Sequence, residues 1–133
     1  MKPAWLYRIG AVVLLLFAVL HTIGFLSFKP PTAEGLAVRD SMTNVHFEAS
    51  GSNLSYGDFY RGFGLFVTVY FLFSAFLAWY LASHPIPEIG WALCAAQIAS
   101  IALGLIYFSV VQAAFAAIVA GLIGWATLRS GAE

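Results

Sequence analysis

Long apolar segments alternate with short polar segments along this chain, and their lengths predict helices that cross a membrane. A helix needs about 20 mostly apolar residues to span a hydrocarbon core about 30 Å thick. The stretch from Ile9 to Phe28 has His21 as its only ionisable side chain, and the stretch from Gly62 to Ala82 carries no charge. These two stretches are the first and second predicted spans.

The third apolar stretch, from Ile89 to Leu128, is 40 residues long and carries no charge. As a single helix it would be about 60 Å long at about 1.5 Å per residue, twice the thickness of the bilayer core. It must therefore fold back once, and the polar residues Ser109 and Gln112 of "YFSVVQ" place the reversal near its middle. The two prolines of "ASHPIPE" separate the second span from the third, because proline lacks the amide donor needed inside a helix but is tolerated in its first turn.

The pattern predicts an all-α fold, an integral membrane four-helix bundle in a single transmembrane domain covering residues 1–133. The expected spans cover about 7–28, 60–82, 88–108 and 112–128, with a polar loop over 29–57. Small residues should let the helices approach closely, because lipid tails offer no hydrophobic incentive for helices to associate. Such residues recur at intervals of four in the last two spans, as Ala92, Ala96, Ser100 and Gly104, as Ala113, Ala117 and Gly121, and as Ala120 and Gly124.

The polar loop also contains a helical pattern. Thr32 can cap a helix, and an apolar stripe with intervals of four, three and four follows it, formed by Val38, Met42, Val45 and Ala49. We expect a short amphipathic helix lying on the bundle or on the membrane interface.

Four spans place both termini on one side of the membrane, and the charges decide which side. Lys2, Arg8 and Arg129 lie with the termini, and Lys29, Arg39 and Arg61 lie with the first loop, so the positive-inside count is a tie. The flank of the first helix usually dominates, which favours cytoplasmic termini. Aromatic residues near the predicted ends on the terminal side suggest an interfacial belt, formed by Trp5, Tyr7, Trp79, Tyr80, Trp91 and Trp125.

Composition supports the membrane assignment and argues against nucleic acid binding and disulfide chemistry. The chain is 62% apolar and 9% charged, far from the roughly 45–50% and about 25% of soluble domains. Net charge is zero and no stripe of Lys or Arg is present, so nucleic acid is not an expected partner. The single cysteine, Cys94, cannot form a disulfide or a CxxC site within one chain.

The predicted topology gathers polar side chains in the half of the bundle that faces the first loop. Ionisable residues inside a membrane are costly and are functional candidates by default. The ligand-binding candidates are His21, His46, Asp58, Tyr60, Arg61, Tyr107 and Gln112, and the acid–base candidates are His21, Glu48 and Asp58.

Each of these residues also has a structural interpretation. Ser55 and Asp58 have the spacing of a helix cap, and Arg61 can pair with Asp58 or extend toward the lipid headgroups. His21 can equally form a hydrogen bond that serves packing alone. Gln97 is better explained by a hydrogen bond between helices than by ligand binding.

Three functions remain open. The first is a pocket between helices that binds a lipid-like or other amphiphilic small molecule by its polar head. The second is an intramembrane enzyme in which His21 moves a proton while Asp58 or Glu48 orients it. The third is an accessory subunit whose partner is another membrane protein, and assembly into a homo-oligomer is a further alternative.

A metal or a haem is not expected. His21, His46, Glu48 and Asp58 are acceptable ligand types, but only His46 and Glu48 are close in sequence, and this spacing is a weak signal. Haem held by two histidines from facing spans is disfavoured, because His21 is the only histidine in a span. No cofactor is assigned.

Two short motifs carry a resemblance to a known group of proteins. The first span closes with "HTIGF", a polar loop follows, and "SYGDFYRGFGL" opens the second span. This layout resembles an uncharacterised family of small bacterial four-helix inner-membrane proteins. The resemblance implies a bacterial inner-membrane location and a single-domain bundle, and it implies no activity.

Overall fold

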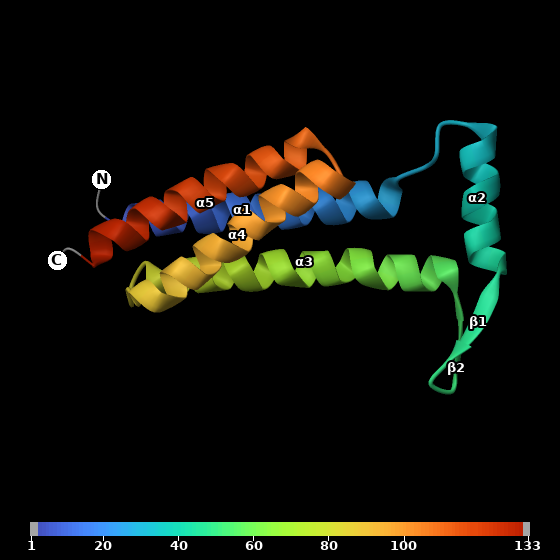
Figure 1. The fold of residues 1–133 in the computed structure, drawn as a ribbon, viewed down its shortest axis with the longest axis horizontal. Helices are drawn as coiled ribbons and strands as arrows, with labels where there is room; N and C mark the ends of the chain where they lie inside the picture. The colour runs from blue at the N-terminus through green and yellow to red at the C-terminus, as the bar shows by residue number, and fades with distance from the viewer. Residues whose placement is uncertain (1–2, 132–133) are drawn as a thin grey trace. The chain divides into compact units, whose positions relative to one another are not determined.

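The computed structural model describes residues 3–131, which form five helices and one β-hairpin (Figure 1). In chain order the elements are α1 (Pro3–Ser27), α2 (Ala33–Asn44), β1 (His46–Ala49), β2 (Ser52–Ser55), α3 (Tyr56–Leu81), α4 (Pro87–Tyr107) and α5 (Val110–Ser130). Helices α1, α3, α4 and α5 contain 25, 26, 21 and 21 residues and are apolar enough to cross a membrane. The predicted fold class, an all-α bundle of four apolar helices, is confirmed.

The chain divides into two compact units. The bundle unit contains the chain up to Ala18 and from Tyr70 onward, and the loop unit contains Val19–Val69. Helices α1 and α3 are each continuous from one unit into the other. The bundle unit therefore has segments of four helices, whereas the loop unit combines parts of two helices with α2 and the hairpin.

Small residues let α4 and α5 pack closely in the bundle unit, as the chain reverses at Ser109. A Cβ atom added at Gly104 would lie 3.1 Å from the backbone nitrogen of Ala113. Farther along, the Cys94 thiol donates to the carbonyl of Ala120 at 3.4 Å. This is the close backbone approach that membrane helices use in place of a hydrophobic driving force.

Some of the predicted small-residue stripes were wrong. Ala92, Ala117 and Gly121 are exposed. The buried small residues of α5 instead follow mixed intervals of three and four, as Ala113, Ala116, Ala120, Gly124 and Thr127. Because a helix has 3.6 residues per turn, each step of four overshoots a full turn by about 40°, so a strict four-residue stripe drifts off the packed face.

Tyr7 was predicted to lie in the interfacial belt, and that prediction was wrong. Its side chain is fully buried, and its hydroxyl lies 2.9 Å from the Thr127 hydroxyl. Thr127 donates its own proton to the Ile123 carbonyl, so Tyr7 is the donor between α1 and α5. Gly90 of α4 makes room for this pair, because a Cβ atom there would lie 2.8 Å from the Tyr7 hydroxyl oxygen.

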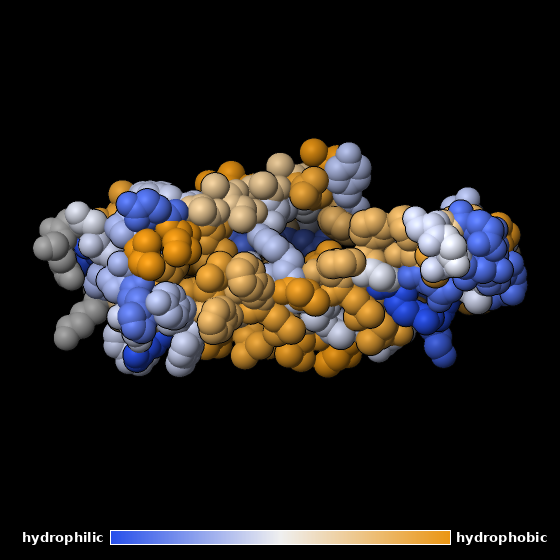
Figure 2. Space-filling view, turned by 90° about the horizontal axis from the view of Figure 1, so that it is seen from below, coloured by the Kyte–Doolittle hydropathy of each residue, from blue (hydrophilic) through white to orange (hydrophobic). Residues whose placement is uncertain are grey.

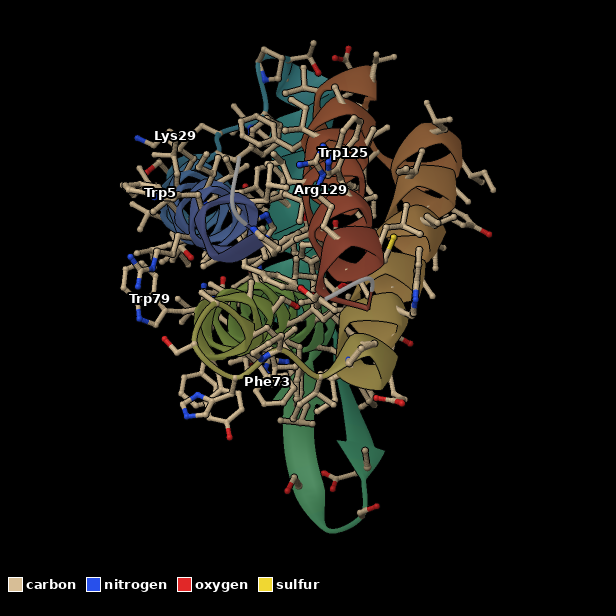
Figure 3. The ribbon with its side chains drawn as sticks, turned by 90° about the vertical axis from the view of Figure 1, so that its left-hand side faces the viewer. Trp5, Lys29, Phe73, Trp79, Trp125 and Arg129 are labelled. Atoms are coloured by element: carbon tan, nitrogen blue, oxygen red, sulfur yellow. The ribbon has the colours of Figure 1, made fainter. Side chains whose placement is uncertain are left out.

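All four tryptophans lie in the bundle unit and are exposed, and their position at the membrane interface stays a prediction. Figure 3 shows Trp5 and Trp79 pointing outward from α1 and α3. The Arg8 guanidinium lies 5.7 Å from the ring centre of Trp79, and the Arg129 guanidinium lies 5.4 Å from that of Trp125. These cation–π contacts pair each amphipathic ring with a charge at a helix end.

Gln97 connects α4 to α3, as predicted for an interhelical hydrogen bond. Its side-chain nitrogen donates to the Tyr70 hydroxyl at 3.0 Å, and that hydroxyl lies 3.3 Å from the Ser100 hydroxyl. Ser100 donates to the Ala96 carbonyl, so the proton order runs from Gln97 to Tyr70 to Ser100. The Gln97 side-chain oxygen is fully buried and accepts no hydrogen bond.

In the loop unit, Thr32 caps α2 as predicted, because its hydroxyl accepts from the backbone nitrogen of Gly35 at 3.1 Å. The second half of the predicted apolar stripe was wrong. Helix α2 ends at Asn44, Val45 is its extended C-cap, and Ala49 belongs to β1. The alternation of exposed and half-buried residues along His46–Ala49 is that of a strand, with period two rather than 3.6.

The antiparallel strands β1 and β2 pair from His46↔Ser55 to Ala49↔Ser52. Ser50 and Gly51 form the two-residue turn and have φ values of 52° and 84°. Positive φ at both central residues is the requirement of the type I′ turn, which matches the twist of the two strands. Figure 2 shows mostly hydrophilic atoms over α2 and the hairpin, and mostly apolar atoms along the long helices.

Candidate ligand-binding site

The loop unit contains a pocket whose walls come from the end of α1, from α2 and from the start of α3. Gly57 lets the end of α2 approach α3, because a Cβ atom there would lie 3.3 Å from the Met42 carbonyl oxygen. The backbone nitrogen of Tyr56 also donates to the Val45 carbonyl at 3.2 Å. These contacts fix the carboxyl end of α2 against the amino end of α3.

The capping pair predicted from the sequence fixes the start of α3. The backbone nitrogen of Asp58 donates to the Ser55 hydroxyl oxygen at 3.0 Å, and the Ser55 hydroxyl donates to Asp58 Oδ2 at 2.7 Å. The Ser55 backbone nitrogen donates to the same oxygen at 3.3 Å. This reciprocal arrangement satisfies backbone donors of the first turn and orients the residues that follow.

Pro30 fixes the other end of α2. A Cβ atom at Gly35 would lie 2.8 Å from Cβ of Pro30, so glycine is needed where the connection packs on the first turn. The backbone nitrogen of Leu36 donates to the Thr32 carbonyl at 3.0 Å and continues the helix. The amino end of α2 is thus held by the connection that contains Pro30, and its carboxyl end is held against the start of α3.

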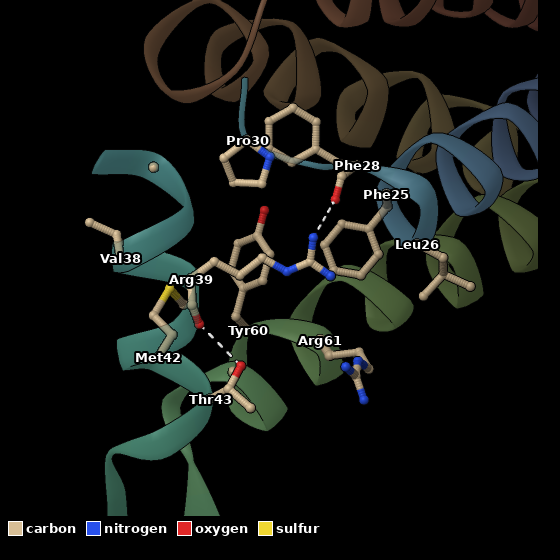
Figure 4. A pocket seen from close by; sticks show the side chains of 12 residues that line it. Phe25, Leu26, Phe28, Pro30, Val38, Arg39, Met42, Thr43, Tyr60 and Arg61 are labelled. Carbon is tan, nitrogen blue, oxygen red and sulfur yellow. Dashed lines mark hydrogen bonds between the residues drawn. The ribbon is translucent and has the colours of Figure 1, made fainter. Parts of the chain in front are cut away.

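The pocket between these elements has a volume of about 320 Å³ (Figure 4). Its walls are mainly apolar and include four cationic or hydroxyl side chains, Arg39 and Thr43 from α2 and Tyr60 and Arg61 from α3. The lining residues are Phe25, Leu26, Phe28, Pro30, Gly35, Val38, Arg39, Met42, Thr43, Gly57, Tyr60 and Arg61. No carboxylate is among these twelve residues.

Arg39 is the main polar side chain of the pocket. Its guanidinium donates from Nη1 to the Phe28 carbonyl at 3.0 Å, a bond drawn as a dashed line in Figure 4. Figure 4 also shows Arg39 stretched across the pocket beside Tyr60, with Arg61 at the opposite margin. The carbonyl of Arg39 accepts from the Thr43 hydroxyl at 3.0 Å, a bond within α2.

Aromatic stacking supports the wall made by α1. The Phe25 ring contacts Gly64 so closely that any side chain at position 64 would collide with it. Phe25 packs against the Tyr60 ring with centroids 5.3 Å apart, and the His21 ring stacks on Phe25 with centroids 5.7 Å apart. His21 Nε2 lies 3.0 Å from the Gly64 carbonyl oxygen, which places this histidine on the connection between α1 and α3.

The structure brings together part of the predicted set. Tyr60 and Arg61 line the pocket, whereas His21 lies behind Phe25 and Asp58 caps α3. His46 and Glu48 are exposed on β1. The His46 Nδ1 atom lies 3.0 Å from the Asn44 carbonyl oxygen.

The other two predicted residues, Tyr107 and Gln112, belong to the bundle unit. Tyr107 is the last residue of α4 and is 72% exposed. Gln112 is part of a capping box, because its side-chain oxygen accepts from the Ser109 backbone nitrogen at 3.1 Å. The polar pair at the predicted reversal therefore starts helix α5.

Sequence reasoning missed Arg39, which it treated only as one of the cations of the first loop. A signal was present, because Gly35, Arg39, Met42 and Thr43 share one face of a helix at intervals of four, three and one. That face carries a glycine one turn before the arginine. Pro30 packs where a side chain at position 35 would lie, and both residues line the pocket that Arg39 crosses.

The arrangement offers cations and a phenol beside apolar walls. Arg39 presents five N–H donors, of which one bonds Phe28. A metal site has no comparable support, because residues 3–131 contain no group of three or more His, Cys, Asp or Glu side chains that could hold one. The chemistry present suits a molecule with a polar head and an apolar body.

No family model, no curated protein and no solved structure matches this chain. The class of protein therefore rests on the fold itself. Four apolar helices of membrane-spanning length identify it as an integral membrane protein.

Proposed function

We propose that this protein binds a lipid-like or other amphiphilic small molecule in the pocket of the loop unit. Arg39, Tyr60 and Arg61 receive the polar head, and the apolar lining residues receive the adjoining part of the chain. The observation that carries this proposal is the pocket of about 320 Å³, which combines these polar groups with walls from α1, α2 and α3. That volume lies near the lower end of the roughly 300–1,000 Å³ typical of ligand sites, so it suits one head group and part of one chain.

Location and orientation belong to the same proposal. The layout and its resemblance favour a bacterial inner membrane, and the flank of the first helix favours cytoplasmic termini. The loop unit would then lie on the non-cytoplasmic side, where the polar head of an outer-leaflet lipid is within reach. Reporter fusions after Glu133 and at Gly51 test the orientation, which is contradicted if the fusion at Gly51 reports the cytoplasm.

A bulky residue at the pocket wall provides the direct test of binding. Val38 and Leu36 are both exposed apolar residues of α2, but only Val38 lines the pocket. We expect Val38→Trp to reduce binding of 1-oleoyl lysophosphatidic acid by about tenfold, since the indole occupies space beside Arg39. The matched control, Leu36→Trp, should bind as the unchanged protein does.

Native mass spectrometry of the full chain in a neutral detergent measures this difference, with monooleoylglycerol as a second probe of the same chain length. If neither probe binds, or if the two tryptophan variants bind both probes equally well, the proposed pocket is contradicted. Retained lipids in the unsupplemented sample identify natural candidates in the same experiment.

Catalysis and an accessory role remain alternatives. Asp58 accepts two hydrogen bonds from Ser55 as a helix cap, which is a structural use of the carboxylate named for proton transfer. His21 contacts Gly64 and Phe25, and neither Asp58 nor Glu48 lines the pocket. The geometry therefore supports binding better than it supports acid–base chemistry.

A further inference from the structure

We propose that the head group held in this pocket is an oxyanion, and that Arg39 is the residue that selects it. This inference rests on the proposed amphiphile binding and names the class of ligand. Phosphate or carboxylate oxygens carried by a lipid are the expected partners, and a small soluble phosphate is the competing source of the same chemistry.

The charges around the pocket favour an anion. Two guanidinium groups, from Arg39 and Arg61, are among the twelve lining residues, and none of the twelve is acidic. Three carboxylates adjoin lining residues along the chain without lining the pocket themselves: Glu34 precedes Gly35, Asp40 follows Arg39, and Asp58 follows Gly57 and accepts two hydrogen bonds from Ser55. The Asp58 charge interacts with Arg61, whereas Arg39 donates to the Phe28 carbonyl and keeps further N–H donors for a ligand.

The contact between Arg39 and Phe28 prepares the guanidinium for this role. The bond from Nη1 to the Phe28 carbonyl orients the planar group, and further N–H donors project from its other edges. Arginine forms paired, charge-assisted hydrogen bonds with carboxylate and phosphate oxygens, which are stronger than bonds between neutral groups. A guanidinium already oriented by the backbone loses less freedom when it binds.

Tyr60 adds a neutral donor beside the cation. Its ring packs on Phe25, which is itself seated on Gly64, so the phenol is held at the wall of the pocket. Figure 4 shows its hydroxyl turned toward Arg39 and Pro30. A hydroxyl donor next to a guanidinium can bond a second oxygen of the same head group.

The apolar lining selects a head group that carries a chain. Phe25 and Leu26 come from the end of α1, Phe28 follows that helix, and Val38 and Met42 come from α2. Inorganic phosphate would leave these walls without a partner. The ligand chemistry is therefore an oxyanion joined directly to an apolar chain, as in a lysophospholipid or a fatty acid.

Three probes separate the contributions of head and chain. These are 1-oleoyl lysophosphatidic acid, monooleoylglycerol with the same chain but no charge, and glycerol 3-phosphate with the same head but no chain. We expect the full-length protein in neutral detergent to bind the first at least about tenfold more tightly than either of the others, a factor typical of one charge-assisted bond. Native mass spectrometry and thermal shift both report the ratio.

Arg39→Gln should abolish the preference for the charged lipid over monooleoylglycerol, and Arg39→Lys should restore part of it. Lys29→Gln is the matched control, because Lys29 is a cation of the same loop that does not line the pocket. The control should keep the preference. If Arg39→Gln and Lys29→Gln lose the preference to the same extent, surface charge alone attracts the lipid. That result overturns the role of Arg39.

The remaining outcomes are equally distinct. Equal binding of the two oleoyl lipids overturns the oxyanion inference and leaves amphiphile binding intact. Binding of glycerol 3-phosphate as tight as that of the lipid identifies a soluble phosphate as the source and overturns the lipid assignment. No binding of any probe overturns both the inference and the function on which it rests.

Discussion

The polar side chains of the two units are used in opposite ways. In the bundle unit, Tyr7, Thr127 and Gln97 are fully buried and bond to neighbouring helices. In the loop unit, Arg39, Tyr60 and Arg61 are exposed beside a pocket. Both sets include side chains of the apolar helices, so polarity alone does not distinguish a structural residue from a candidate binding residue.

The difference lies in the donors that remain after folding. Tyr7 donates its one proton to Thr127, and the Thr127 proton goes to Ile123. Arg39 bonds one carbonyl and has further donors directed away from it. Substitutions in the bundle unit should therefore change the free energy of unfolding, and substitutions at the pocket should change ligand binding.

The largest expected effect on stability is at Gly90. A Cβ atom there would collide with the side chain of Thr127 and approach the Tyr7 hydroxyl, so Gly90→Ala forces α4 away from the Tyr7–Thr127 pair. We expect a loss of about 1–3 kcal/mol in the free energy of unfolding, typical of overpacking. Gly121→Ala is the control, because nothing lies within 4 Å of a Cβ atom at that position.

Unfolding of both variants in mixed detergent, followed by circular dichroism, gives the comparison. Equal stability of the Gly90 and Gly121 variants would mean that the interior of the bundle unit accommodates added volume. That result would contradict the expectation that substitutions in the bundle unit act on the free energy of unfolding through tight packing.

Tyr7→Phe should have a smaller effect. It removes the donor to Thr127 while Thr127 keeps its bond to Ile123, so we expect a loss of about 0.5–1.5 kcal/mol. Tyr107→Phe is the matched control, since Tyr107 is 72% exposed at the end of α4. The same unfolding measurement applies, and an equal loss in both variants would contradict a structural role specific to Tyr7.

The smallest expected change is at Gln97, despite its complete burial. Gln97→Met removes the bond to Tyr70, and it also removes a buried oxygen that accepts no hydrogen bond. The two effects oppose each other, so stability should change by less than about 1 kcal/mol in either direction. A loss of several kcal/mol in the free energy of unfolding would show that the side-chain oxygen has a partner in the membrane. Gln97 would then bond a group outside the protein, as is proposed for the pocket residues.

The sequence was sufficient to predict the elements that depend on local pattern and length. The four apolar helices, the reversal at Ser109 and the caps at Thr32 and Ser55 all follow from hydropathy, chain reach and the chemistry of helix ends. The hairpin was missed because Val45 and Ala49 continue the helical spacing of Val38 and Met42 by coincidence. Once α2 ends at Asn44, those residues take up extended conformations.

The site could be predicted only in part, because it depends on contacts between distant segments. Tyr60 and Arg61 were found from their place beside an apolar helix. The displacement of His21 behind Phe25 depends on the packing of that ring on Gly64, which no local pattern encodes. The place of Arg39 in the pocket could not be predicted, because it depends on how α2 lies across the end of α1. That arrangement is set by Pro30, Gly35 and Gly57.

The burial of Cys94 has a practical consequence. It is the only thiol in the chain, it is 6% exposed, and it faces the carbonyl of Ala120 inside the bundle unit. A cysteine introduced at the exposed Asn53 of the hairpin would be the one readily alkylated by a membrane-impermeant maleimide. Intact cells treated with such a reagent would reveal the compartment of the hairpin without any change to the native helices.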